Sequence, residues 1–413
     1  MTHGYNRRLT DLRFVNHSAP TSRIDGTTLI DHATEISYTW AARLWNTRKK
    51  RLENIRDDYQ VVVLPPHQGD VSEKIVNSKL PIFSAKYPIA TCFREQFPGN
   101  EDRLHIINEA PLAKHIYLIA SPTTKDEVLD IQRVAWHFSN VLRAQYITAI
   151  LPFFPGTRQD KNVSPEGNYM PSPINIAADT ESMTRVNSFM AIEPHSFATE
   201  TAASTIEKPL LPTTPWQFLM NQVLNHPMKI SNSETVILTP ENTIEVRPDQ
   251  GRNIAAIRAA KHYNLKSASF IKKRLDPKTV ILEMNATDRK RVMNKECIVY
   301  DDEFATAGTL AKIATKLKEY GAKGLTVVGV HGKFIGDWEN NIKGSFIRKV
   351  FISDSRSPIG NIKTYVKSGK IEVLSLENYI ADLIEADLKG INFWKDDSYK
   401  HLVLQSNCKS ESH

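Results

Sequence analysis

The chain has 413 residues, 24% of them charged, and a formal net charge of +7, so it is long enough for two domains with proper cores. No apolar run reaches the ~18 residues that cross a membrane, so we expect no membrane association. The positive charge is spread along the chain, which fits phosphorylated ligands and excludes a concentrated nucleic-acid-binding patch. The three cysteines, Cys92, Cys297 and Cys408, have neither metal nor disulfide spacing, which indicates a reducing compartment, and we expect the cytoplasm.

Residues 1–58 differ from the regular pattern that follows, and we interpret them as an N-terminal extension. A helix is expected from Asp31, with apolar side chains such as Trp40 and Trp45 on one face. The basic run 48–51 is expected on the solvated face of that helix. The extension should therefore pack as an arm on the body of the protein or on a partner chain.

From Tyr59 onward, strand and helix patterns alternate. The expected strands are 61–64, 116–119, 147–151, 236–238, 325–330 and 371–375, and the expected helices are 71–76, 128–142, 215–224, 310–320 and 376–388. Such alternation predicts an α/β protein with parallel sheets covered by helices. The proline-containing stretch 206–234 is the expected domain boundary.

The stretch Ile298–Leu310 carries the strongest chemical signal. A short β-branched run ends in two adjacent carboxylates, Asp301 and Asp302, and a turn of small residues then opens a helix. The loop after such a strand is where open α/β sheets bind ligands. The carboxylates suit ribose hydroxyls or a hydrated Mg²⁺. A phosphate can be held by successive backbone N–H groups, here those of Thr306, Ala307, Gly308 and Thr309. The alternative interpretation is an ordinary turn with a solvated acidic pair.

The segment Asp301–Thr309 resembles the fingerprint of the phosphoribosyltransferase fold that binds phosphoribosyl pyrophosphate (PRPP). Residues 152–161, with Arg-Gln-Asp-Lys at their end, are similar to a segment of the ribose-phosphate pyrophosphokinases, and further motifs follow in that family's order. The resemblance covers about residues 59–388. It implies two phosphoribosyltransferase-like domains, each a mainly parallel sheet flanked by helices: 59–205 on the ATP side and 206–388 on the ribose 5-phosphate side, followed by a tail, 389–413.

The resemblance implies an activity, namely transfer of the diphosphoryl group of Mg-ATP to the anomeric hydroxyl of ribose 5-phosphate, giving PRPP and AMP. The family's catalytic pair falls on Lys272 and Arg274, which otherwise read as a solvated charge cluster. ATP binding falls on Phe97, Glu101, Arg158, Gln159 and Asp160. Ribose 5-phosphate binding falls on Asp301, Asp302, Thr306, Ala307, Gly308 and Thr309. The Mg²⁺ ligands are His195 and Asp249; a competing alignment places Pro240 and Glu241 at the second position, and a lone histidine is otherwise often structural.

Ala305 occupies the position of an acid in the family fingerprint, and we hypothesise that Glu303 compensates for it. This departure leaves a second interpretation open, a non-catalytic, synthetase-like regulatory or PRPP-binding protein. A third, a phosphoribosyltransferase that consumes PRPP, is disfavoured by the loop that carries Phe97. The family completes its adenine site with that loop from a neighbouring subunit, so the resemblance also implies self-association as a dimer-based oligomer.

Overall fold

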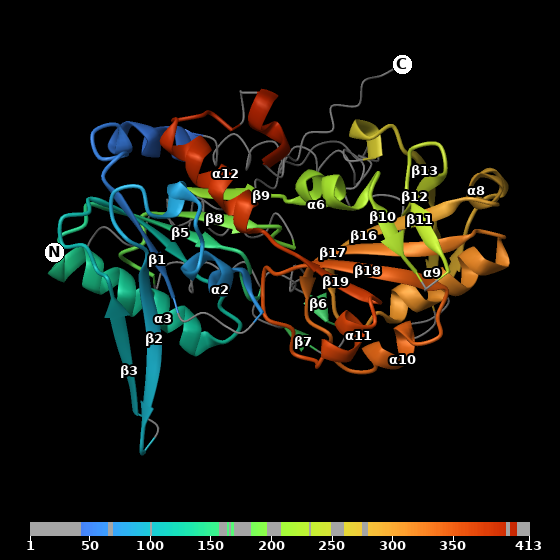
Figure 1. The fold of residues 1–413 in the computed structure, drawn as a ribbon, viewed down its shortest axis with the longest axis horizontal. Coiled ribbons are helices and arrows are strands. Elements are labelled where there is room, and N and C mark those ends of the chain that lie inside the picture. The colour runs from blue at the N-terminus through green and yellow to red at the C-terminus, as the bar shows by residue number, and fades with distance from the viewer. Residues whose placement is uncertain are drawn as a thin grey trace.

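A computed structural model describes residues 43–64, 69–99, 101–156, 163–164, 167–168, 183–195, 208–230, 233–248, 260–274, 280–393 and 397–402. Two larger sheets lie side by side, with helices packed on them (Figure 1). Strand and helix alternate along most of both halves, and the predicted α/β class with parallel sheets is confirmed.

The first sheet has seven strands in the order β3-β2-β1-β4-β5-β8-β9, and every neighbouring pair except β2–β3 is parallel. Its strands are β1 (Tyr59–Val63), β2 (Ala90–Phe97), β3 (Glu101–Ile107), β4 (His115–Ile119), β5 (Tyr146–Leu151), β8 (Ser188–Ile192) and β9 (Leu210–Thr213). The four strands β1, β4, β5 and β8 are buried along their whole length, as expected for a parallel sheet with both faces covered. Its short helical elements are α2 (Val71–Val76), η1 (Pro81–Phe83), α3 (Lys125–Trp136) and η2 (His137–Val141).

The second sheet has six strands in the order β13-β12-β16-β17-β18-β19, all parallel. They are β12 (Thr243–Arg247), β13 (Lys266–Ser269), β16 (Glu296–Phe304), β17 (Gly324–Gly332), β18 (Ile347–Ser353) and β19 (Ile371–Leu374). The helices of this half are α8 (Ala286–Val292), α9 (Gly308–Glu319), α10 (Trp338–Ile342) and α11 (Lys363–Lys367). Three short antiparallel pairs complete the strands: β6 (Val163–Ser164) with β7 (Gly167–Asn168), β10 (Pro227–Lys229) with β11 (Thr235–Ile237), and β14 (Ile271–Arg274) with β15 (Val280–Glu283).

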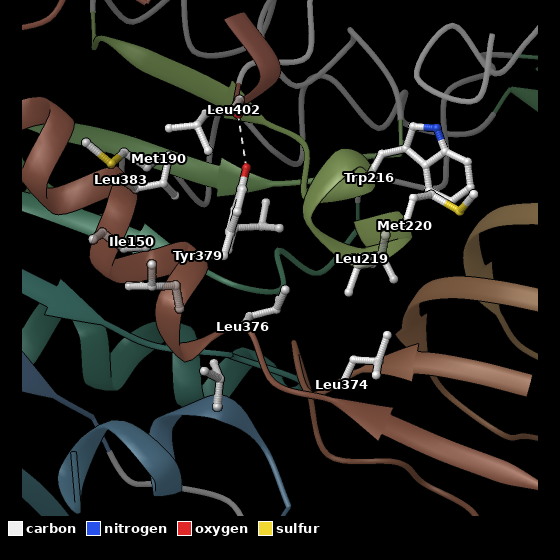
Figure 2. Packing of buried hydrophobic residues seen from close by; sticks show 14 of the residues in the cluster. Ile150, Met190, Trp216, Leu219, Met220, Leu374, Leu376, Tyr379, Leu383 and Leu402 are labelled. Atoms are coloured by element: carbon white, nitrogen blue, oxygen red, sulfur yellow. Dashed lines mark hydrogen bonds between the residues drawn. The ribbon is translucent and has the colours of Figure 1, made fainter. Parts of the chain in front are cut away.

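One apolar core joins the two halves. Helices α6 (Trp216–Val223) and α12 (Glu377–Leu388) place Leu219 and Tyr379 in the same cluster as side chains from both sheets (Figure 2). Within this cluster the Tyr379 hydroxyl donates to the backbone oxygen of Leu402, at 3.0 Å, in the 3₁₀ turn η3 (Asp397–Leu402). The last helix thus leaves the second sheet and returns over the first (Figure 1).

The expected domain limits stay predictions, although two observations bear on them. β9 pairs with β8, so the first sheet runs to Thr213, beyond residue 205. Leu402 is buried, although it lies in the expected tail.

The basic run of the N-terminal extension is not entirely solvated. Residues 43–52 form a helix, and Arg48 in that helix is 2% exposed. The prediction of a solvated face for 48–51 is therefore wrong at Arg48, because a buried carboxylate, Asp387 of α12, pairs with its guanidinium.

Candidate active site

Three strands, β8, β16 and β17, end where the two halves of the molecule meet. His195 follows β8 by three residues, and Asp302 lies near the end of β16. The His195 Nδ1 atom forms a hydrogen bond and ion pair with Asp302 Oδ2. Two residues predicted for different parts of the site, one for metal and one for ribose, are thus in direct contact.

The two acids lie in the strand itself. β16 continues through Asp302 to Phe304, because Glu303 pairs with His331 and Phe304 with Gly332 on β17. The strand therefore includes both carboxylates and continues two residues beyond them. Asp301 and Asp302 are both half-buried there, and each influences the protonation of the other.

The adjacent acids have opposite protonation tendencies. Partial burial and the charge of Asp302 raise the pKa of Asp301 well above its usual value. Burial disfavours the charged form of Asp302 as well, but the hydrogen bond and charge of His195 lower its pKa. The pair therefore holds one charged carboxylate and one group able to donate a hydrogen bond, a combination suited to sugar hydroxyls.

A third acid, Glu193, lies behind this pair. It is 5% exposed and adopts the left-handed backbone conformation, with φ 44°. Burial raises the pKa of Glu193 to about 8, against the hydrogen bond from Thr214, whose hydroxyl donates to Glu193 Oε2 at 2.5 Å. Glu193 was not among the predicted site residues, although it stands two residues before His195.

The predicted phosphate loop opens the twelve-residue helix α9. Ala307 precedes the helix in the left-handed conformation, φ 58°, and no side chain caps the helix N-terminus. Asn341 Nδ2 donates to the backbone oxygen of Thr306 at 2.9 Å, which fixes the loop. Thr306 and Thr309 are exposed. A left-handed residue before a helix N-terminus directs successive N–H groups toward one point, where an anion can bind.

Comparison with known proteins gives a consistent picture. No family model matches the chain. It is 28% identical over 280 residues to the ribose-phosphate pyrophosphokinase of Vibrio parahaemolyticus, and 29% identical over 280 residues to that of Vibrio cholerae; each match covers 67% of this chain and 82% of the relative. The protein of that name from Buchnera aphidicola is 28% identical over the same length. The chain is a homologue of the ribose-phosphate pyrophosphokinases.

The fold agrees with that relationship. The crystal structure of phosphoribosylpyrophosphate synthetase from Mycobacterium smegmatis matches with a TM-score of 0.59 at 18% identity, over 80% of this chain and 99% of the other. The expected architecture of two phosphoribosyltransferase-like sheets is confirmed. Among the described residues, no helix is long and apolar enough to cross a membrane.

The structure places four further predicted site residues on two hairpins. Phe97 and Glu101 are paired across the end of the β2–β3 hairpin, which projects from the body (Figure 1). The backbones of Lys272 and Arg274 lie in β14, opposite Leu282 and Val280 of β15, and α9 packs against β15. Four predicted residues lie outside the described part of the chain: Arg158, Gln159, Asp160 and Asp249.

The donor atoms at the junction fit a magnesium ion shared with a phosphorylated substrate. A metal-binding histidine usually donates its other ring N–H to a carboxylate, and Asp302 takes that place beside Nδ1 of His195. In the part of the chain that the structure describes, no three metal-binding side chains gather. Mg²⁺ often needs only one or two protein ligands beside water and substrate phosphates, so the pair fits the ion.

Proposed function

We propose that this protein is a ribose-phosphate diphosphokinase, a transferase of nucleotide biosynthesis. It would transfer the diphosphoryl group of ATP to the anomeric hydroxyl of ribose 5-phosphate and release PRPP and AMP. Homology to the pyrophosphokinases supports this activity. The observation that carries the proposal is the contact of His195 with Asp302, because it joins the two predicted substrate sides in one place.

The transfer requires little covalent chemistry from the protein. The hydroxyl oxygen forms a bond to the β-phosphorus, the bond from that phosphorus to the bridging oxygen of AMP breaks, and the hydroxyl proton is released. Such reactions depend on positioning and on neutralising charge at the phosphate oxygens. Asp301 and Asp302 would orient the ribose hydroxyls, and the amides of residues 306–309 would bind the 5-phosphate.

The negative charge of the ATP phosphates would be neutralised by cationic side chains and by Mg²⁺. We assign to Lys272 and Arg274 the stabilisation of the diphosphoryl group in transfer, with the arginine offering a planar pair of donors. His195, with Asp249, would hold Mg²⁺, which supplies positive charge to the phosphates of ATP when bound. The triphosphate would also contact Arg158, Gln159 and Asp160.

The adenine side of the proposal involves a second copy of the chain. Phe97 and Glu101 lie at the end of a hairpin that points away from β16 (Figure 1). An aromatic face can stack on adenine, and a carboxylate can accept from its amino group. We therefore propose that the hairpin contacts the adenine of ATP bound to a neighbouring copy in a dimer-based oligomer. The substrates and the cysteine usage fit the cytoplasm, where we place the enzyme.

Ala305 favours one competing function, a protein that binds PRPP without making it, since the family's acid is missing there. Incubation with ribose 5-phosphate, ATP and Mg²⁺, followed by chromatography of AMP and PRPP, separates the two. The proposal predicts both products from the wild type and their loss in Lys272→Ala. Absence of AMP at every magnesium and phosphate concentration, with PRPP binding retained, would establish the non-catalytic function. Consumption of PRPP with a free base would instead identify a phosphoribosyltransferase.

A further inference from the structure

His331, at the end of β17, connects the acid-bearing sheet to the turn that carries His195. It lies opposite Glu303 in the β16–β17 register and is 5% exposed. Its Nε2 atom lies 3.0 Å from the backbone oxygen of Glu193. Residues 303 and 331 belong to the second half of the molecule and residue 193 to the first, so this hydrogen bond spans the junction.

The partners of His331 define its tautomer. A carbonyl oxygen only accepts hydrogen bonds, so Nε2 must carry the proton that Glu193 accepts. Nδ1, 2.8 Å from the Ser355 hydroxyl, is then the acceptor. The Val330 oxygen accepts from Ser353 Oγ at 2.7 Å and lies 3.1 Å from Ser355 Oγ, so the shorter contact of the Ser355 hydroxyl is the one with Nδ1. A neutral imidazole with one defined tautomer results, and burial lowers the pKa of His331 to about 4, in agreement.

The ring is also held by packing and by its own backbone. Phe153 lies edge-on against it, with ring centroids 5.1 Å apart and planes at 77°. The backbone of His331 forms an isolated bridge with Asp354, the residue before Ser355. The backbone oxygen of Asp354 in turn accepts from Val71 N, at 2.7 Å, at the start of α2 in the first half. His331 therefore has little freedom to follow a displaced Glu193.

The accepting carbonyl belongs to a backbone position that needs outside support. Glu193 has a positive φ of 44°, which is unfavourable for a residue with a side chain. Its N–H donates to Thr213 O at 2.7 Å and its side chain accepts from Thr214; both partners lie on the first half. The His331 bond ties this conformation, two residues before His195, to the strand pair that bears Asp302, alongside the contact of His195 with Asp302 itself.

We propose that His331 is a positioning residue, which holds the Glu193–His195 turn at the distance from β16 that lets His195 meet both Asp302 and a divalent cation. This inference rests on the proposed function, because the cation is the one that ATP would bring. His331 touches neither substrate nor ion in this proposal. Removing its N–H should loosen the cation site without altering the phosphate loop at residues 306–309.

The test compares two substitutions at this position. His331→Gln places an amide N–H near the position of Nε2, whereas His331→Leu fills similar space and donates nothing. Electron paramagnetic resonance measures Mn²⁺ binding in the presence of α,β-methylene ATP, an analogue whose scissile bond is blocked. Groups that orient a metal-binding side chain typically contribute 10- to 100-fold in metal affinity. We expect Mn²⁺ to bind about 10-fold more weakly in His331→Leu and near the wild-type affinity in His331→Gln.

Kinetics provide a second readout that a general loss of stability would not move. The magnesium concentration for half-maximal activity should rise in His331→Leu, while the KM for ribose 5-phosphate stays unchanged. Ser78→Ala is the matched control, because the Ser78 hydroxyl also bonds across the two halves, to Glu377 Oε1 at 2.5 Å, but away from the turn. It should leave Mn²⁺ binding unchanged.

Ser355→Ala keeps the test decisive if His331→Leu does not fold. It retains the ring but removes the hydroxyl bonded to Nδ1, so the ring is less firmly held and Mn²⁺ should bind about threefold more weakly or worse. Wild-type Mn²⁺ affinity in a folded His331→Leu, or in Ser355→Ala if the former does not fold, would overturn the inference. Equal losses in His331→Leu and His331→Gln would do the same. If one of these results is found and the wild type makes PRPP, the inference about His331 is overturned and the proposed function stands. If the wild type binds no Mn²⁺ with the analogue, both the inference and the proposed function are overturned.

Discussion

Ala305 is the residue at which the chain departs most from the acid pattern of the fingerprint. It is 8% exposed, and its backbone oxygen accepts from Ile335 N at 3.1 Å. The hypothesised substitute, Glu303, lies two residues earlier on β16 and forms an ion pair with Lys333 at 2.8 Å. Glu303 can replace the missing acid only if it leaves Lys333 when a substrate binds. The hypothesis therefore requires the Glu303–Lys333 ion pair to open in the substrate complex.

Restoring the acid tests this hypothesis. A missing carboxylate beside a sugar costs about 1–3 kcal/mol if a hydroxyl or a metal-bound water is left unpaired. If Glu303 compensates, Ala305→Asp should leave kcat/KM unchanged or raise it modestly, measured as AMP release at saturating Mg²⁺. Activity that rises from zero would instead identify a protein that has lost catalysis.

Glu303→Gln in the two backgrounds provides the control. The substitution should lower kcat/KM in the natural sequence and have less effect beside Ala305→Asp, since one acid would then serve for the other. Ala305→Asn, of the same shape as aspartate but uncharged, should give no gain. Equal losses from Glu303→Gln in both backgrounds would mean that Glu303 does not act for the missing acid.

At the scale of elements, strands that form continuous apolar runs were the most predictable. The apolar runs 61–64, 116–119 and 147–151 correspond to β1, β4 and β5, because a fully covered parallel strand reads as a continuous apolar run. Helix α2 was predicted at its observed bounds. The β2–β3 hairpin was missed, because its strands are charged and largely exposed. β9 was missed because Pro212 lies within a short stretch that otherwise reads as a loop.

The candidate site was predictable in its parts and not in its connections. The fingerprint at 301–309 gave the helix start and the acids, since a strand-to-helix turn is local. The contact of His195 with Asp302 joins residues 107 positions apart, and the bond of His331 to Glu193 joins residues 138 apart. Such contacts depend on how the two halves pack, which no local pattern encodes.

The hairpin is the element that most directly tests the adenine assignment. Arg103 lies over one face of the Phe97 ring, 4.7 Å from its centroid; a cation on one face is compatible with an adenine on the other. Stacking of a base on an aromatic side chain contributes about 1–3 kcal/mol. Phe97→Ala should therefore raise the KM for ATP about 10-fold, with the KM for ribose 5-phosphate unchanged, in steady-state assays.

Phe93 offers a matched control within the same strand. It is 40% exposed and stacks on His105, with ring centroids 4.9 Å apart, four residues before Phe97. Phe93→Ala should leave the KM for ATP near the wild-type value. Similar changes in both variants would point to general disturbance of the hairpin rather than to an adenine contact.

At the scale of the whole molecule, the N-terminal helix is part of the folded body. Arg48 pairs with Asp387 of α12 through two bonds of 2.5 and 2.7 Å, across 339 positions of sequence. Two further N–H groups donate at 2.8 Å to hydroxyls of the first sheet, those of Ser188 and Thr148. Tyr117 donates to the same carboxylate at 2.6 Å. One guanidinium thus connects the N-terminal extension, the first sheet and the last helix.

The Arg48–Asp387 pair adds little net stability, but losing one of its two charges costs a great deal. A buried ion pair gains little over apolar residues of the same size, because both charges lose their hydration, but removing one partner leaves the other charge buried and unpaired. Burial disfavours the charged form of Asp387, and the charge and hydrogen bonds of Arg48 lower its pKa instead. The carboxylate therefore depends on the arginine to stay ionised in the interior.

Arg48→Ala should therefore destabilise the protein by about 3–5 kcal/mol, seen as a lower midpoint in urea unfolding followed by tryptophan fluorescence. The exposed Arg51, in the same helix, provides the control, and Arg51→Ala should stay within about 0.5 kcal/mol of the wild type.

Replacing both partners, Arg48→Met with Asp387→Leu, should recover most of the loss, since neither charge then remains buried. Equal midpoints for Arg48→Ala and Arg51→Ala would show that the extension is not held by this ion pair. A double variant no more stable than Arg48→Ala would show that the hydroxyl contacts of the guanidinium, rather than its charge, fasten the extension to the two halves.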